Sequence, residues 1–252
     1  MKEKWTIRQI KEYLLNEKPS EEVMRSFYQD ERKGVQTLLK QHENKQVKEQ
    51  QEKDQFVMMS KFEQSLWQNK YRYIAGVDEV GRGPLAGPVV AAAVILPEDF
   101  QLLGINDSKK LSKKQRELFY QYITKHAIDY KIGIVEADEI DRINILQASK
   151  HAMSQAIEQL NQVDYALIDA VMLENLSIPQ EAIIKGDQKS ISIAAASIIA
   201  KVTRDQLMDD LHNEYPAYAF NRNSGYGTKD HLHALDQFGM TPIHRRSFLK
   251  SR

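Results

Sequence analysis

The stretch GVDEVGRGPLAGPVV at residues 76–90 joins two adjacent carboxylates to a loop rich in glycine and proline. The apolar pattern of residues 73–80 predicts a strand that ends in Asp78 and Glu79, and residues 89–96 predict a second strand. The glycine spacing is G-x-G-x-x-x-G and no G-K-S/T follows, so the dinucleotide and P-loop signatures are both missing. Because a strand rather than a helix comes next, no helix N-terminus is available to receive a phosphate.

Two further predicted strands also end in carboxylates. Residues 164–169 end in Asp169, and residues 182–185 lead into Asp187. Taken alone, an Asp-Glu pair is best explained as a solvated strand end, but several buried strand ends with unpaired carboxylates would be costly unless basic groups or cations faced them. Oxygen ligands of this kind select Mg²⁺ or Mn²⁺. The candidate metal ligands are Asp78, Glu79, Asp169 and Asp187. They form one site only if their strands are neighbours, a condition that the sequence leaves open.

Other clusters of titratable residues indicate structural roles. The acidic residues at 136–141 precede a predicted helix, where acids cap the helix and complement its dipole. The seven histidines contain no H-E-x-x-H pair, and His231 and His233 do not share a helix face. The chain has no cysteine, which excludes disulfides, thiolate catalysis and zinc-thiolate sites.

Composition places the chain among globular proteins. It has 252 residues, of which 42% are hydrophobic and 28% charged, with no net charge. Zero net charge argues weakly against nucleic-acid binding by bulk charge alone. The first residues lack the apolar core of a signal peptide, and no run is long enough to span a membrane. These features predict a cytoplasmic protein.

The chain changes character near Tyr71. Before it, Thr6 and Gln9 form a predicted capping box, Ser20 starts a second helix, and residues 40–54 suggest a solvated helix or a linker. The sequence therefore predicts a helical accessory segment at 1–70 and a catalytic domain with a C-terminal helical region at 71–252, with the boundary within residues 55–70.

After Tyr71 the pattern is that of an α/β protein. Ser112 caps a predicted helix that ends near His126, and residues 131–135 predict a third strand. The other predicted helices cover about residues 144–160, 194–211 and 231–238. Strands that come first in hairpins and then alternate with helices predict a mixed β-sheet flanked by helices, with a small helical N-terminal extension.

Six segments, in the same order along the chain, resemble bacterial ribonuclease HII, of the type 2 ribonuclease H family. They are GVDEVGRGPLAGPVV at 76–90, DSKKLS at 107–112, LIDA at 167–170, KGDQKSISIAAASIIAKVTRD at 185–205, SGYGT at 224–228 and TPIHRRSF at 241–248. The related ribonuclease HIII proteins usually carry G-K-G where this chain has Gly81-Arg82-Gly83, so ribonuclease HII is the better match. The resemblance implies a ribonuclease H-like fold.

The resemblance also implies a reaction. It assigns catalysis and metal binding to the four carboxylates named above, through two Mn²⁺ or Mg²⁺ ions, with Asp78 as the ligand shared by both. The implied enzyme hydrolyses the RNA strand of RNA–DNA hybrids and nicks on the 5′ side of ribonucleotides embedded in duplex DNA, leaving 3′-hydroxyl and 5′-phosphate ends. Two alternatives remain at this stage: a related nuclease that acts only on long hybrids, and a silent nucleic-acid-binding module.

Substrate contacts follow from the same resemblance. The backbone around Gly81, Arg82 and Gly83 is expected to contact the 2′-hydroxyl that distinguishes RNA from DNA. Tyr226 resembles the family tyrosine that packs on the sugar beyond the ribonucleotide. The candidate phosphate contacts are Lys109, Lys110, Lys201 and Arg204. For Lys109 and Lys110, ordinary solvated charge is an equally good explanation.

The first 70 residues fall outside the minimal catalytic unit of the family. They are either a module that binds duplex or a partner, or a stabilising extension. Trp5 and the turn at residues 32–34 are consistent with nucleic-acid contact and equally with packing. The preferred metal, the oligomeric state and any protein partner are not indicated by the sequence.

Overall fold

The computed structural model describes residues 5–17 and 19–249. Residues 1–4, 18 and 250–252 lie outside it, and they include the start of the predicted accessory segment and the end of the predicted catalytic domain. The chain forms two compact units, Met1–Gln55 and Phe56–Arg252. This division falls at the N-terminal edge of the predicted boundary region. The assignment of residues 1–70 to an accessory segment stays a prediction.

The first unit is helical, with α1 (Ile7–Asn16), α2 (Glu21–Tyr28) and most of α3 (Lys33–Met59). The predicted capping box is confirmed, since Gln9 N donates to Thr6 Oγ1 over 3.2 Å and Thr6 N donates to Gln9 Oε1 over 2.8 Å. Residues 40–54 are helical throughout, so they are not an irregular linker. The small core of this unit consists of Ile10, Leu14, Phe27, Val35 and Leu39.

Trp5 and Arg32 make internal contacts in this unit. The Trp5 ring lies edge-on against Tyr13 and Phe27, with ring centroids 5.1 and 5.6 Å apart. Arg32 pairs with Asp30 over 2.6 Å and donates to the Trp5 carbonyl over 2.8 Å. These contacts support packing as the role of both side chains.

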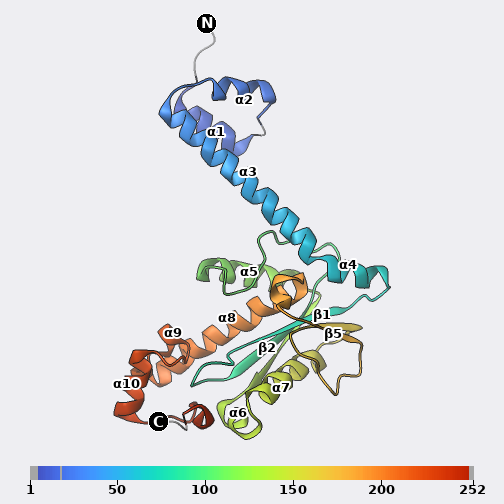
Figure 1. The fold of residues 1–252 in the computed structure, drawn as a ribbon, viewed down its shortest axis with the longest axis vertical. Coiled ribbons are helices and arrows are strands. Elements are labelled where there is room, and N and C mark those ends of the chain that lie inside the picture. Colours follow the sequence, from blue (N-terminus) through green and yellow to red (C-terminus); the bar gives the residue numbers. More distant parts are fainter. Residues whose placement is uncertain (1–4, 18, 250–252) are drawn as a thin grey trace. The chain divides into compact units, whose positions relative to one another are not determined.

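The second unit is built on a five-stranded sheet in the order β3-β2-β1-β4-β5. Figure 1 shows this sheet with β1, β2 and β5 labelled. The strands are β1 (Ile74–Val80), β2 (Val89–Ile95), β3 (Asp129–Val135), β4 (Tyr165–Asp169) and β5 (Gln180–Ile183). β1 and β2 are antiparallel, as are β2 and β3, whereas β4 runs parallel to both β1 and β5. The predicted mixed sheet is therefore confirmed.

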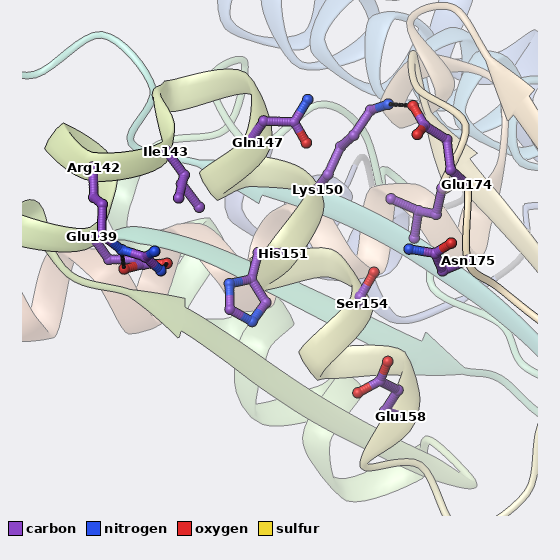
Figure 2. Close-up of a pocket in the computed structure, with 11 residues that line it drawn as sticks. Glu139, Arg142, Ile143, Gln147, Lys150, His151, Ser154, Glu158, Glu174 and Asn175 are labelled. Carbon is purple, nitrogen blue, oxygen red and sulfur yellow. Dashed lines mark hydrogen bonds and ion pairs between the residues drawn. The ribbon is translucent and has the colours of Figure 1, made fainter.

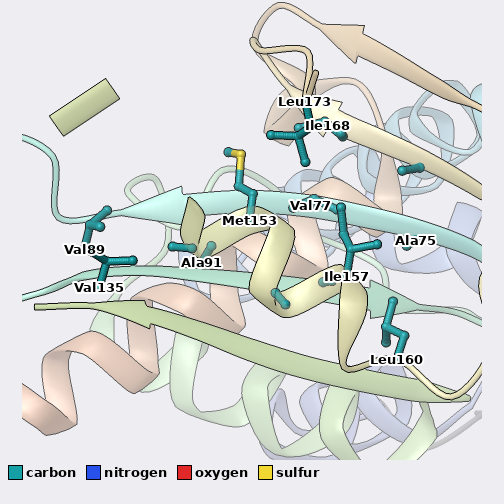
Figure 3. Packing of buried hydrophobic residues seen from close by; sticks show 14 of the residues in the cluster. Ala75, Val77, Val89, Ala91, Val135, Met153, Ile157, Leu160, Ile168 and Leu173 are labelled. Carbon is teal, nitrogen blue, oxygen red and sulfur yellow. The ribbon is translucent and has the colours of Figure 1, made fainter. Parts of the chain in front are cut away.

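Helices cover both faces of this sheet. α7 (Ile145–Glu158) packs on one face through Ala152, Met153 and Ile157, in a core shared with Val77 and Ala91 (Figure 3). On the other face, α5 (Lys113–His126) and α8 (Ile191–Glu214) share a core with β2. The remaining helices of this unit are α4 (Lys61–Gln68), α6 (Ala137–Ile143), α9 (Phe220–Asn223) and α10 (Lys229–Phe238), with short 3₁₀ turns η1 (Gly186–Gln188), η2 (Pro216–Tyr218) and η3 (Arg246–Phe248).

Two glycines allow helices to lie close to the sheet. A Cβ at Gly76 would stand 2.1 Å from the Ser192 carbonyl carbon on α8, and one at Gly133 would stand 1.9 Å from the Ala152 oxygen on α7. No side chain fits at either distance, so any larger residue would push the helix away. Small residues in the first half of α8 serve the same close packing.

One predicted strand is shifted. β5 covers Gln180–Ile183 rather than 182–185. Lys185 has φ 56° and ψ 46°, a left-handed conformation that a strand cannot contain, so the chain has already left the sheet before Asp187. No helix within residues 5–17 and 19–249 is long and apolar enough to cross a membrane.

Candidate active site

Three of the predicted ligands meet at one edge of the sheet. Carboxylate oxygens of Asp78, Glu79 and Asp169 lie within 4.8 Å of one another. The strand register explains the meeting, because Val77 pairs with Ile168 in the parallel β1–β4 ladder, so Asp78 and Asp169 follow side by side. The neighbouring strands thus meet the condition that the sequence left open.

Asp78 is held in place from α8. Ser197 on α8 donates to its carboxylate, and Glu79 N donates to Asp78 Oδ1 over 2.7 Å. The Ser197 hydroxyl lies 3.0 Å from the Ser108 hydroxyl, and both serines are buried. Neither serine was predicted to have a role, although each lies within a segment that carries the family resemblance.

Asp187 lies on η1, just beyond β5. It lines the same hollow as the other three carboxylates but is not part of the cluster within 4.8 Å. Gly186 N donates to Asp169 Oδ1 over 2.7 Å, which ties the turn that carries Asp187 to the end of β4. The structure therefore brings all four predicted carboxylates to one hollow of about 340 Å³.

Burial and mutual repulsion disfavour the charged forms of these acids. Burial, followed by the charges of Glu79 and Asp169, raises the pKa of Asp78 well above its usual range. Burial likewise raises the pKa of Glu79 and Asp169. For Asp187, burial and then the charges of Asp107 and Asp169 raise the pKa to about 6. Oxygen-only donors crowded in this way fit a divalent cation such as Mg²⁺ or Mn²⁺, whose charge would remove the repulsion.

The glycine loop beside the acids rests on two buried arginines. Arg245 donates through Nε, Nη1 and Nη2 over 2.6–3.1 Å, and its acceptors are the carbonyls of Gly81, Arg82, Pro84 and Gly87. Arg204 donates to the carbonyls of Pro88, Ala86 and Ser224 over 2.9–3.2 Å. Burial lowers the pKa of Arg245 to about 9 and that of Arg204 to about 10. Gly81 has φ 96°, and a Cβ there would lie 2.3 Å from Arg204 Nε.

This arrangement corrects one predicted contact. Arg204 is 1% exposed and faces the loop carbonyls, so it is not placed to bind a phosphate from solvent. Its guanidinium instead supports the loop. The sequence missed this role because a buried arginine and an exposed one look alike in a helical pattern.

The other predicted substrate residues fall into two groups. Among the described residues, those that line the hollow with the carboxylates include Gly81, Arg82, Gly83, Lys109 and Tyr226, whereas Lys110 and Lys201 do not line it. Arg82 Nη1 lies 3.2 Å from Glu79 Oε1. Lys201 pairs with Asp205 on its own helix over 2.6 Å.

A second and larger hollow, of about 520 Å³, lies between α6, α7 and residues 173–175 (Figure 2). Arg142 pairs with Glu139 over 2.5 Å, and Lys150 pairs with Glu174 over 3.0 Å. Its arginine and its lysine are each paired with one of its three carboxylates, whereas the first hollow holds four carboxylates and two cations, Arg82 and Lys109.

A mixed sheet flanked by helices, with carboxylates gathered at the ends of β1 and β4, defines the chain as a metal-dependent nuclease of the ribonuclease H-like fold. The family model for Ribonuclease HII matches residues 75–251, and the family model for the Ribonuclease HII N-terminal domain matches residues 6–67. The chain belongs to the ribonuclease HII family, as its sequence motifs predicted. It is therefore an endonuclease of the ribonuclease H type that acts on RNA–DNA substrates, and enzymes of this family depend on divalent metal ions.

Individual relatives agree with this assignment. The chain is 56% identical to ribonuclease HII of Oceanobacillus iheyensis, with 96% of this chain and 94% of that protein aligned. It is 54% identical to ribonuclease HII of Enterococcus faecalis, over 97% and 96% of the two chains. The crystal structure of ribonuclease H2 from Pyrococcus horikoshii matches with a TM-score of 0.58 and 29% identity, over 69% of this chain and 92% of that one.

Proposed function

We propose that this protein hydrolyses the RNA strand of RNA–DNA hybrids and nicks duplex DNA on the 5′ side of embedded ribonucleotides, leaving 3′-hydroxyl and 5′-phosphate ends. The observation that carries the proposal is the shared hollow, where Gly81, Gly83 and Tyr226 face the same space as the carboxylates. Groups suited to reading a ribose therefore lie beside groups suited to hydrolysing its phosphodiester.

Four carboxylates would hold the metal ions: Asp78, Glu79, Asp169 and Asp187. When bound, two Mn²⁺ or Mg²⁺ ions activate a water and stabilise the leaving 3′-oxygen. The protein's own contribution is to keep the acids rigid, through the Ser197 bond to Asp78 and the Gly186 bond to Asp169. Asp78, the most buried of the four and adjacent to two of the others, is our candidate for the ligand shared by both ions.

Selectivity for RNA would come from the loop and the tyrosine. Gly83 is exposed and carries no side chain, so its peptide group is open to a 2′-hydroxyl. Gly81 lines the same hollow, but it is buried against Arg204 and its carbonyl already accepts from Arg245. A Cβ at Gly83 would lie 3.4 Å from Tyr226 Cε1, so the loop and the ring border the same space. Tyr226 is 48% exposed, as a residue that packs on a sugar must be.

Phosphate contacts would come from exposed cations near the acids. Lys109 lines the hollow and Lys110 follows it on the same turn. Lys201 would have to leave Asp205 to reach a phosphate, and Arg82 would have to leave Glu79. The accessory role of residues 1–70 and a cytoplasmic location belong to the same proposal.

The deciding experiment is cleavage of a labelled DNA duplex that contains one ribonucleotide, with Mg²⁺, with Mn²⁺ and with chelator. An all-DNA duplex and a long RNA–DNA hybrid serve as controls. A single metal-dependent nick on the 5′ side of the ribonucleotide is expected. Cleavage of the hybrid alone would refute the junction specificity but not the nuclease activity. Cleavage in the presence of chelator would refute the metal-dependent mechanism.

A further inference from the structure

Two histidines form a buried pair beneath the loop that carries Tyr226. His231 on α10 and His244 near the C-terminus are 0% and 2% exposed, and their Nε2 atoms lie 3.0 Å apart. The rings pack among Tyr218 and Phe220. Neither histidine lines the hollow that holds the carboxylates.

The hydrogen-bond partners determine where the protons lie. Thr241 N can only donate, and it lies 2.9 Å from His244 Nδ1, so this nitrogen accepts. Neutral His244 then carries its proton on Nε2 and donates to His231 Nε2. His231 in turn carries its proton on Nδ1 and donates to the Tyr226 carbonyl over 2.9 Å. Burial, followed by the neighbouring His231, lowers the pKa of His244 to about 4, which keeps His244 neutral at pH 7.

The last acceptor in this series of hydrogen bonds is the backbone carbonyl of Tyr226, the residue proposed to pack on a sugar. Tyr226 stands between Gly225 and Gly227, so its own neighbours offer no side chains to pack against and few limits on backbone rotation. Gly225 lies close to Ala86 and accepts from Leu85 N over 2.8 Å, and hydrogen bonds to the backbone of Tyr226 itself fix the rest of the turn. Tyr226 N donates to Asn223 O over 2.9 Å, and Thr228 N and His231 Nδ1 both donate to Tyr226 O. Of these three, only the His231 bond ties the residue to α10 and, through His244, to the C-terminal segment.

We propose that the His231–His244 pair is a positioning device for Tyr226 that sets the preference for embedded ribonucleotides over long hybrids. The inference rests on the proposed role of Tyr226 at the sugar beyond the ribonucleotide. The histidines do not touch the reacting phosphate, so they act on selectivity through Tyr226. Loss of the pair should lower kcat/KM for the embedded ribonucleotide more than for the hybrid.

The test compares two substitutions at His231 with an exposed control on the same helix. His231→Leu removes the donor to Tyr226, whereas His231→Asn keeps an amide donor near the position of Nδ1. His231→Leu should lower kcat/KM for the embedded ribonucleotide about tenfold, which corresponds to the loss of one well-placed hydrogen bond, and the hybrid less than about threefold. His231→Asn should restore most of the loss, and exposed His233→Asn should change neither substrate.

A double substitution separates positioning from general stability. If the pair acts through Tyr226, His231→Leu should cost less than about twofold further in a Tyr226→Ala background. An equal loss on both substrates, tracking the fall in Tm, would overturn the inference, as would full additivity with Tyr226→Ala. Should His231→Leu not fold, His244→Asn keeps the acceptor for Thr241, breaks the link to His231 and gives the same comparison. A wild-type enzyme that does not nick the embedded ribonucleotide would overturn the proposed function itself, and this inference with it.

Discussion

Buried charges are compensated differently at the acidic end of the sheet and in the basic support beneath the glycine loop, which consists of Arg204 and Arg245. Asp78, Glu79 and Asp169 are crowded together with raised pKa values, an arrangement that favours an incoming cation. Arg204 and Arg245 are more deeply buried, yet each donates to several loop carbonyls. Charge left without full compensation marks the site of chemistry, and charge satisfied by backbone marks the scaffold.

The largest effect should come from the acidic end. Asp78→Asn keeps the size of the side chain but removes a ligand charge, so cleavage should fall about a thousandfold or more. The free energy of unfolding without metal should not fall, because the substitution relieves repulsion with Glu79 and Asp169. Single-turnover cleavage and urea denaturation measure the two effects. Exposed Asp138→Asn is the control, and a similar loss in that variant would break the comparison.

The basic support should affect stability before it affects chemistry. Arg245→Met leaves the carbonyls of Gly81, Arg82, Pro84 and Gly87 without their donor, and should cost roughly 3 kcal/mol or more of unfolding free energy. Denaturant unfolding of the full chain measures this cost. Arg246→Met removes the adjacent, exposed arginine and should change stability by less than about 1 kcal/mol. A cost as small for Arg245→Met would contradict the scaffold role.

The buried His231–His244 pair should make the free energy of unfolding depend on pH. The unfolded chain binds a proton at His244 below about pH 6.5, whereas the folded protein resists until about pH 4. Stability from this group is therefore present above pH 6.5 and is lost as the pH falls toward 4, by roughly 2 kcal/mol between pH 7 and pH 5. His244→Gln cannot titrate, so its unfolding free energy should vary less over this range. Parallel pH profiles for the two proteins would show that His244 does not contribute.

The smallest predicted effect is a difference in substrate binding between variants of two adjacent lysines, Lys109 and Lys110. Lys109 lines the hollow and Lys110 does not. Lys109→Met should weaken substrate binding about tenfold at low salt and reduce the salt slope by about one, and Lys110→Met should stay within about threefold. KM measured across a salt series decides between them. Equal effects would mean that both are ordinary surface charges.

Strand-end positions allowed the site to be predicted in outline. Asp78, Glu79, Asp169 and Asp187 were selected because each follows an apolar run, and all four line one hollow. Ser197, by contrast, acts on Asp78 from another element, and nothing in its helical pattern shows which strand it faces. The predicted bounds of β5 were wrong because the left-handed turn at Lys185 is set by the chain around it rather than by its own residue type.

The sequence by itself determined the family, the mixed sheet and the acidic residues of the site, because apolar periodicity and local motifs record short-range physics directly. Only the tertiary structure decided what each remaining charge does. Arg204 faces carbonyls rather than phosphate, and Arg245 holds the backbone of a loop that is distant from it in sequence. Burial, and the hydrogen bonds that burial requires, depend on which segments meet in space, and that information is absent from any local stretch of the chain.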